Sequence, residues 1–141
     1  MKSLSKIKIG IIGSAGYTGG ELIRILLNHP NAEIIFAHSK SNAEKFISEV
    51  HTDLIDETNL KFTDKFSNAV EVLFLCVGHG EAKVFLSKNK TEGEIKIIDL
   101  SQDFRLVGSK KSEIENFIYG LPELNKERIK TAQFVANPGC F

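Results

Sequence analysis

The stretch that decides the fold runs from Ile9 to Gly20 and reads IGIIGSAGYTGG. Its apolar start belongs to a β-strand expected over residues 7–12, and a helical pattern follows over residues 18–28. Between them lie glycines spaced G-x-x-G-x-x-G, which permit a tight turn and let the backbone approach a pyrophosphate closely. The N–H groups at the start of the helix attract the same anion. This order predicts a dinucleotide-binding loop rather than an empty structural turn, with contacts from Gly13, Ala15, Gly16, Tyr17, Thr18 and Gly19.

The rest of the chain alternates short apolar runs with helical patterns. Further strands are expected over residues 33–38, 70–77, 95–100 and 133–136. Further helices are expected over residues 81–88, 112–118 and 125–130. The runs are mostly apolar throughout, which is typical of strands covered on both faces. The alternation predicts an α/β domain over residues 1–141, with a Rossmann-type, doubly wound and mainly parallel sheet.

The helical patterns also predict which side chains face the sheet. The first helix presents an apolar face formed by Leu22, Ile23, Leu26 and Leu27. Val84 and Phe85 are expected to point inward from the next helix, and Asn125 is expected to cap the last one.

The cofactor preference is predicted from the end of the second strand, about 20 residues beyond the glycine loop. An Asp or Glu at that place accepts a hydrogen bond from a ribose 2′-hydroxyl, but here the chain reads HSKS over residues 38–41. Hydroxyls and a cation suit a 2′-phosphate, so Ser39, Lys40 and Ser41 are expected to bind NADP. The alternative is a solvated polar turn without a ligand.

The two cysteines lie in different contexts. Cys140 directly follows an expected strand, at the edge where a parallel sheet binds its ligands, and a helix start there favours the reactive thiolate. From these residues alone, a nucleophile and a small core residue remain alternatives. Cys76 lies within the most apolar strand and is expected to be a core residue. Gly78 and His79 follow that strand and are expected to contact the cofactor or shape the loop, with a general-base role for His79 as an alternative.

Composition and charge exclude several classes of protein. The chain has 141 residues, of which 42% are hydrophobic, and its 18 basic and 18 acidic residues give a net charge of +0. A neutral protein has no overall field to attract a polyanion, so neither nucleic acid nor a membrane surface is an expected partner. The start of the chain shows no signal-peptide core, which predicts a cytoplasmic protein. No cysteine or histidine cluster has the spacing of a metal site, so no metal is expected.

Five segments of the chain resemble the N-acetyl-gamma-glutamyl-phosphate reductase family. They are GSAGYTGGEL at 13–22, GHGEA at 78–82, DLSQDFRL at 99–106, YGLPEL at 119–124 and ANPGC at 136–140. They occur in the family's order and span nearly the whole chain, so together they are far more specific than the glycine loop alone.

The resemblance implies NADPH-dependent reduction of N-acetyl-glutamyl 5-phosphate to the semialdehyde, with release of phosphate, in arginine biosynthesis. Cys140 matches the family's nucleophile, whose thiolate displaces phosphate to form a thioester that hydride then reduces. Asn137 could donate to the substrate phosphate or the developing oxyanion, and Arg105 could pair with a substrate oxyanion. The alternatives are a turn side chain for Asn137 and a surface salt bridge for Arg105.

The chain departs from this family in its length. Family members are more than twice as long, with a second α/β domain that carries an acid/base histidine and forms much of the subunit contact. None of His29, His38, His51 and His79 lies in a segment that matches that histidine. The chain is therefore expected to be a fragment that binds NADP without turnover, and the full-length protein is expected to be a homo-oligomer.

Three other functions are alternatives to this reductase. The alternatives are an aminoadipyl-phosphate reductase of lysine biosynthesis, an aspartate-semialdehyde dehydrogenase and a non-catalytic NADP-binding module. The run YGLP at 119–122 argues against the aspartate-semialdehyde dehydrogenase.

Overall fold

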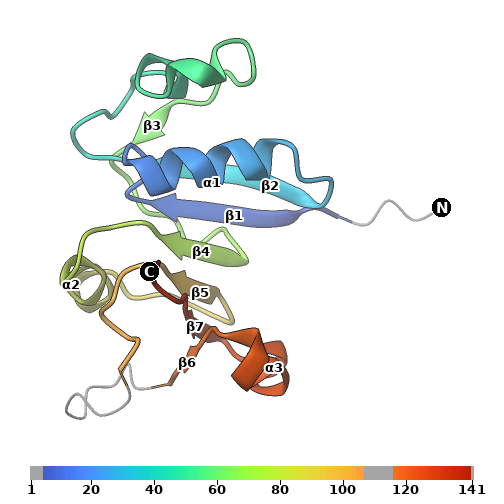
Figure 1. Ribbon diagram of the computed structural model, residues 1–141. Helices are drawn as coiled ribbons and strands as arrows, with labels where there is room; N and C mark the ends of the chain where they lie inside the picture. The colour runs from blue at the N-terminus through green and yellow to red at the C-terminus, as the bar shows by residue number, and fades with distance from the viewer. Residues whose placement is uncertain (1–4, 107–115, 141) are drawn as a thin grey trace.

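A parallel sheet forms the centre of the protein in a computed structural model that describes residues 5–106 and 116–140. In these residues seven strands follow the order β3-β2-β1-β4-β5-β7-β6, and all the strand pairs are parallel. The strands are β1 (Ile7–Ile12), β2 (Ala32–His38), β3 (Phe62–Thr63), β4 (Val72–Leu75), β5 (Lys96–Asp99), β6 (Phe117–Tyr119) and β7 (Phe134–Ala136). The chain winds outward in both directions from β1 and β4, which confirms the predicted Rossmann-type fold (Figure 1).

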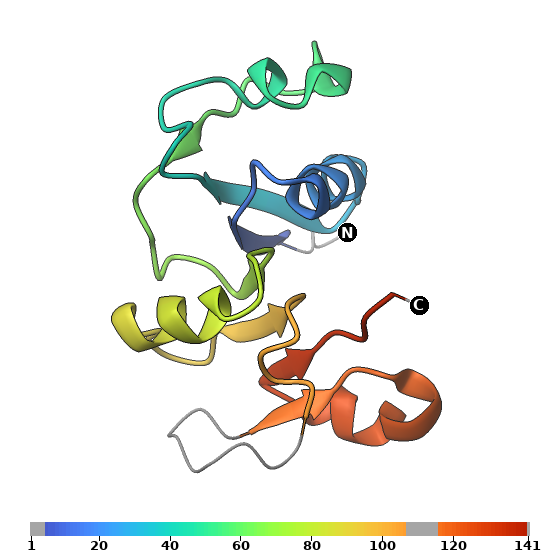
Figure 2. The same ribbon diagram turned by 60° about the vertical axis from the view of Figure 1, so that its left-hand side comes forward.

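Helices cover both faces of this sheet. They are α1 (Tyr17–Leu27), α2 (Glu81–Lys88) and α3 (Pro122–Thr131), with short 3-10 helices η1 (Ile47–Glu49) and η2 (Thr52–Leu54). Figure 2 shows α1 and α3 on one side of the strands and α2 on the other. Ile23 of α1 is fully buried in one apolar cluster, and Ala82 of α2 is fully buried in a second one. Burial on both faces explains why the strand sequences are apolar throughout.

The helices are short, and their inward faces differ in part from the prediction. Among the described residues, none of the helices has the length and apolar character needed to cross a membrane. The bounds of α2 agree with the expected residues 81–88, and Phe85 is half-buried as expected. Val84 was wrongly expected to point inward, because its side chain is 50% exposed. Val84 lies two residues from the buried Ala82, and residues two apart in an α-helix point to nearly opposite sides of it.

The helix expected over residues 112–118 is wrong where the structure describes it. Residues 112–115 lie outside the described part, and Phe117–Tyr119 form β6, which pairs with β7. Phe117 stacks on Phe104 and on Phe134, with ring centroids 4.0 Å and 5.4 Å apart. Aromatic side chains favour a strand where they can pack on a neighbouring strand. Pairing with β7 therefore makes these residues a strand and not a helix.

Two smaller predictions also need correction. Asn125 does not cap α3, because this helix begins at Pro122 after Leu121, and Asn125 itself has non-helical angles and donates to the Tyr119 carbonyl at 3.0 Å. Proline suits the first position of a helix because its missing N–H would have no partner there. The strand expected over residues 70–77 is shorter, because β4 pairs with only the last four residues of β1.

Candidate active site at the carboxyl edge of the sheet

The pairing register brings the carboxyl ends of five strands to one level. The last paired residues across the sheet are His38, Ile12, Leu75, Asp99 and Ala136. The residues that follow them along this edge are Ser39, Gly13, Cys76, Leu100 and Asn137. Open parallel sheets bind ligands outside this edge where the strand order reverses, which here is between β1 and β4. The register therefore gathers the loops that carry the predicted site residues.

The glycine loop is closely packed at two of its glycines. Gly13 has a φ of +75°, and a Cβ there would lie 2.3 Å from the Cys76 carbonyl oxygen. A Cβ on Gly19 would lie 2.6 Å from the Cα of Ser14. At Gly16 the nearest such atom is 3.7 Å away. Gly13 and Gly19 are thus required by the fold of the loop itself, whereas Gly16 leaves open space that suits the approach of a pyrophosphate.

The start of α1 is open to an anion. Gly16 precedes the helix without a side-chain cap, and the first turn contains no acidic residue. The loop is fastened to β2 by the N–H groups of Gly13 and Ser14, which both donate to the His38 carbonyl at 3.2 Å and 3.1 Å. The first N–H groups of a helix lack partners within it and carry a partial positive charge. The start of α1 can therefore hold the pyrophosphate predicted for it.

The start of α2 is different, because a carboxylate of the protein occupies it. Asp103 accepts hydrogen bonds from the backbone N–H of Gly80 at 2.6 Å and of Lys83 at 3.1 Å. Glu81 accepts a further bond from the N–H of Gly78 at 3.0 Å. The role of Asp103 has no local sequence signal, because Asp103 lies 23 residues from Gly80. Of these two helix starts, α1 is the one available to a ligand.

The residues expected at the 2′-phosphate are not equally accessible. Lys40 and Ser41 are exposed, whereas Ser39 is only 8% exposed and its hydroxyl accepts a bond from Asn42 at 3.3 Å. Burial and the nearby Lys40 cation lower the pKa of His38, so its imidazole is neutral at pH 7. Lys40 therefore supplies positive charge at the tip of β2, with Ser41 beside it.

Gly78 and His79 form an exposed loop after β4. His79 accepts a hydrogen bond at Nδ1 from the N–H of Gln102 at 3.2 Å. Together with the Asp103 contacts, this bond joins the loop after β4 to the segment after β5. The structure thus supports the expected loop-shaping role, and a contact of Gly78 or His79 with the cofactor stays a prediction.

The two thiols have contrasting surroundings. Cys76 packs against the core, and burial, followed by the nearby Asp99 carboxylate, raises the pKa of the Cys76 thiol to about 12. Asp99 is itself fully buried, and its carboxylate accepts bonds from the hydroxyl and N–H of Ser101 at 2.8 Å and 3.1 Å. Cys140 is exposed. A thiol must lose its proton to attack, so at neutral pH Cys76 is inert.

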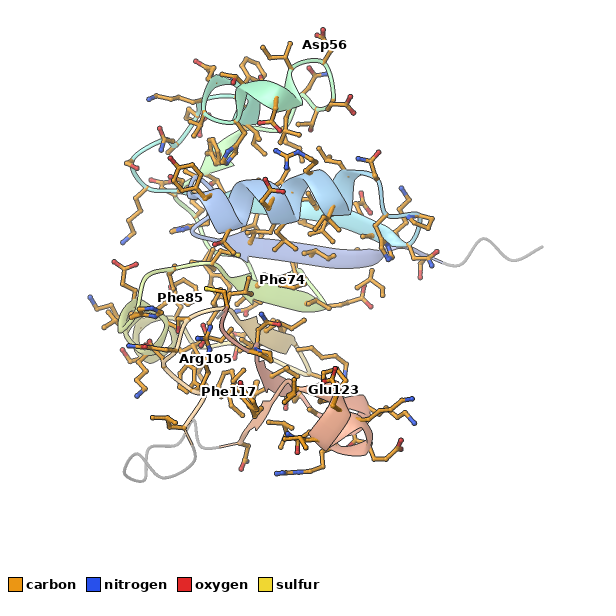
Figure 3. The ribbon with its side chains drawn as sticks, viewed as in Figure 1. Asp56, Phe74, Phe85, Arg105, Phe117 and Glu123 are labelled. Carbon is orange, nitrogen blue, oxygen red and sulfur yellow. The ribbon has the colours of Figure 1, made fainter. Side chains whose placement is uncertain are left out.

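The turn before Cys140 is held from two sides. The Asn137 N–H donates to the Asp99 carbonyl at 2.8 Å, and the Asn137 carbonyl accepts from Nε of Arg105 at 2.9 Å. Arg105 also donates from Nη2 to the Leu100 carbonyl at 2.9 Å, and a Cβ on Gly139 would lie 2.5 Å from its Nη1. Figure 3 labels Arg105 among the side chains between α2 and β6. The guanidinium therefore fastens the turn that carries the exposed thiol.

These contacts bear on the alternatives for Arg105 and Asn137. Among the described residues Arg105 forms no salt bridge, so the surface ion pair considered for it is absent there. The Asn137 side chain donates to the Pro138 carbonyl at 3.2 Å, which is the turn role considered for it. Substrate contacts from either residue stay predictions.

An open glycine loop at the switch point of a doubly wound sheet defines a dinucleotide-binding domain of the Rossmann class. The profile of the family described as "Semialdehyde dehydrogenase, NAD binding domain" matches residues 8–132. The chain belongs to this family, and its ligand class is a nicotinamide dinucleotide. The matched residues end before Cys140.

Individual relatives agree with this family. The chain is 55% identical to the N-acetyl-gamma-glutamyl-phosphate reductase of Azobacteroides pseudotrichonymphae and 54% identical to that of Bacteroides thetaiotaomicron, in each case over 96% of the chain. It spans only 42% and 41% of the length of these relatives. Its fold is similar to that of an aspartate semialdehyde dehydrogenase with NADP from Candida albicans, with a TM-score of 0.69 and 18% identity over 89% of this chain and 36% of that one.

Proposed function

We propose that this chain is the cofactor-binding and nucleophile-bearing part of an N-acetyl-gamma-glutamyl-phosphate reductase that uses NADP. The observation that carries the proposal is the exposed Cys140, in a turn fastened by Asp99 and Arg105. This turn shares the ligand-binding edge with the open start of α1. Identities of 53% to 55% with reductases of this name support the substrate class.

The proposed chemistry follows from these positions. The Cys140 thiolate attacks the carbonyl carbon of the acyl phosphate, a C–S bond forms, and the C–O bond to phosphate breaks. When bound, the nicotinamide supplies the hydride that reduces the resulting thioester to the aldehyde. Reduction of the thioester carbon breaks the C–S bond and returns the thiolate. Nη1 of Arg105, beside Gly139, is near enough to this turn to stabilise an oxyanion of the substrate.

The first prediction concerns the choice between NADP and NAD. We expect tighter binding of NADP, because Lys40 and Ser41 are exposed where a carboxylate would otherwise bind the ribose. In a Lys40→Ala variant the ratio of NADP affinity to NAD affinity should fall about tenfold, since one charge-assisted hydrogen bond is removed. Titration of both dinucleotides at low salt measures this ratio, with Lys88→Ala on α2 as the control. Equal affinities in the parent protein, or an unchanged ratio in Lys40→Ala, contradict the 2′-phosphate assignment.

The second prediction concerns the two thiols. At pH 7.5, which is far below the pKa of about 12 of the Cys76 thiol, iodoacetamide should label Cys140 and leave Cys76 unmodified in the folded protein. Peptide mass spectrometry at successive times gives both labelling rates. In urea both thiols should react, which shows that burial protects Cys76. Faster labelling of Cys76 in the folded protein contradicts both assignments.

A further inference from the structure

We infer that His51 is a positioning residue for the pyrophosphate of the dinucleotide, because it sets the orientation of the Ala15 N–H in the glycine loop. The inference rests on the proposed binding of a dinucleotide at this loop. It concerns a residue outside the segments that carry the family resemblance.

The contact on which it rests joins parts of the chain that are far apart in sequence. Nε2 of His51 lies 2.8 Å from the carbonyl oxygen of Ser14, 37 residues earlier. A carbonyl oxygen only accepts hydrogen bonds, so Nε2 of His51 carries the proton and donates. The ring also lies over Gly20, where an added Cβ would be 2.6 Å from two ring atoms. This contact explains why a second glycine follows Gly19.

The geometry of the peptide bond converts this contact into an orientation of the next N–H. No cis peptide bond occurs in the described residues, so the Ser14 carbonyl and the Ala15 N–H point in opposite directions in one plane. Since the carbonyl points to His51, the Ala15 N–H points away from it. Holding the carbonyl therefore holds the N–H.

Ala15 differs from its neighbours in the loop. The N–H groups of Gly13 and Ser14 donate to the His38 carbonyl, and that of Gly16 donates to the Gly13 carbonyl at 3.3 Å. Within residues 5–106 and 116–140, the Ala15 N–H has no hydrogen-bond partner. Of the N–H groups from Gly13 to Gly16, it is the one that the protein leaves for an anion, next to the open start of α1.

His51 is anchored independently of the loop that it contacts. Its N–H donates to the Ile47 carbonyl at 2.9 Å, and its own carbonyl accepts from the Leu54 N–H at 3.0 Å. Ile47 and Leu54 are buried in the core beneath α1. Asp53 also forms an ion pair with Arg24 of α1, although an exposed pair of this kind contributes little by itself. The ring therefore has a fixed support from which to hold the Ser14 carbonyl.

The test removes and then restores the donor. His51→Phe keeps a ring but loses the N–H, and we expect the Kd values of NADP and NAD to rise by the same factor, about tenfold, which corresponds to about 1.4 kcal/mol. The ratio of the two affinities should stay unchanged, because both dinucleotides carry the pyrophosphate. His51→Gln, whose amide nitrogen can reach the place of Nε2, should recover most of the affinity. His29→Phe is the matched control, because His29 is exposed at the end of α1.

The outcomes separate this inference from the proposed function. Failure of the parent protein to bind either dinucleotide contradicts the proposed function, whereas parent-like binding by His51→Phe contradicts only the inference. Equal losses in the Phe and Gln variants also contradict it, since the donor would then be irrelevant. In the parent protein the ¹⁵N–¹H signal of Ala15 should shift strongly on saturation with NADP. An unmoved Ala15 signal at saturation overturns the inference without any variant.

Discussion

A Gly13→Ala variant is expected to lose dinucleotide binding by about 100-fold or more and to lose more than about 2 kcal/mol of unfolding free energy. The added Cβ would meet the Cys76 carbonyl oxygen at 2.3 Å, and the φ of +75° disfavours any side chain. Neither strand can move away without breaking hydrogen bonds of the sheet, because β1 and β4 are paired at its centre. The loop must therefore shift, which displaces the N–H groups that face the anion. Urea unfolding and dinucleotide titration measure the two losses.

Gly16→Ala is the matched control for this prediction. Gly16 has a φ of −78°, and its added Cβ would find the nearest atom 3.7 Å away. Its unfolding free energy should stay within about 1 kcal/mol of the parent value, the cost of alanine at a helix N-cap. Its affinity for the dinucleotide should still fall, because the new methyl group faces the space left for the pyrophosphate. Parent-like stability and binding in Gly13→Ala would show that the loop is not built as described.

The second large effect concerns Cys140, the proposed nucleophile. In a full-length protein of this family that carries this chain, Cys140→Ser should lower turnover on the order of 10⁴-fold or more, because a serine hydroxyl is far less reactive than a thiolate without a base beside it. Dinucleotide affinity should stay unchanged, since the glycine loop and the tip of β2 are untouched. Cys76→Ser is the control, and it should affect stability more than turnover because Cys76 packs against the core. Comparable loss of turnover in both variants contradicts the assignment of Cys140.

Residues 1–141 alone should show no reductase turnover even though they form the sheet. Hydride transfer to a thioester needs thiol, nicotinamide, oxyanion donors and a proton source together. In the described residues the only histidine on the loops after β4 and β5 is His79, and its Nδ1 accepts a bond from Gln102. Losing one proton-transfer group typically costs about 10²–10⁴-fold in rate. Easily measured turnover by these residues would make His79 the first residue to replace.

Local patterns predicted the elements nearest the glycine loop well. β1 has the expected bounds Ile7–Ile12, and α1 differs from the expected residues 18–28 by one residue at each end. Both are specified by neighbouring residues, since an apolar run meets glycines and an apolar helical face follows. β6 was wrongly expected to be helical because the run Phe117–Tyr119 becomes a strand only through pairing with β7. The two-residue β3 was missed for the same reason, as it depends on the end of β2.

The candidate site, too, could be predicted from the sequence only where neighbouring residues determine it. The position of Cys140 after a strand was readable from the sequence, because strand and turn are adjacent. The hydrogen bond that holds its turn could not be predicted, since Arg105 and Asn137 lie 32 residues apart in sequence. The contact of His51 with Ser14 spans 37 residues and likewise has no local pattern. Contacts between loops at the end of a sheet join residues that are far apart in sequence, so their side-chain partners have no local pattern.

The reverse reaction of the full-length protein tests directly whether Cys140 is the nucleophile of an acyl-phosphate reductase. N-acetyl-glutamate semialdehyde, NADP and phosphate are supplied together, and NADPH formation is followed by its absorbance. We expect turnover that requires phosphate, prefers NADP to NAD and disappears in Cys140→Ser. Turnover that persists without phosphate, or that survives in Cys140→Ser, would contradict an acyl-phosphate reductase with Cys140 as its nucleophile.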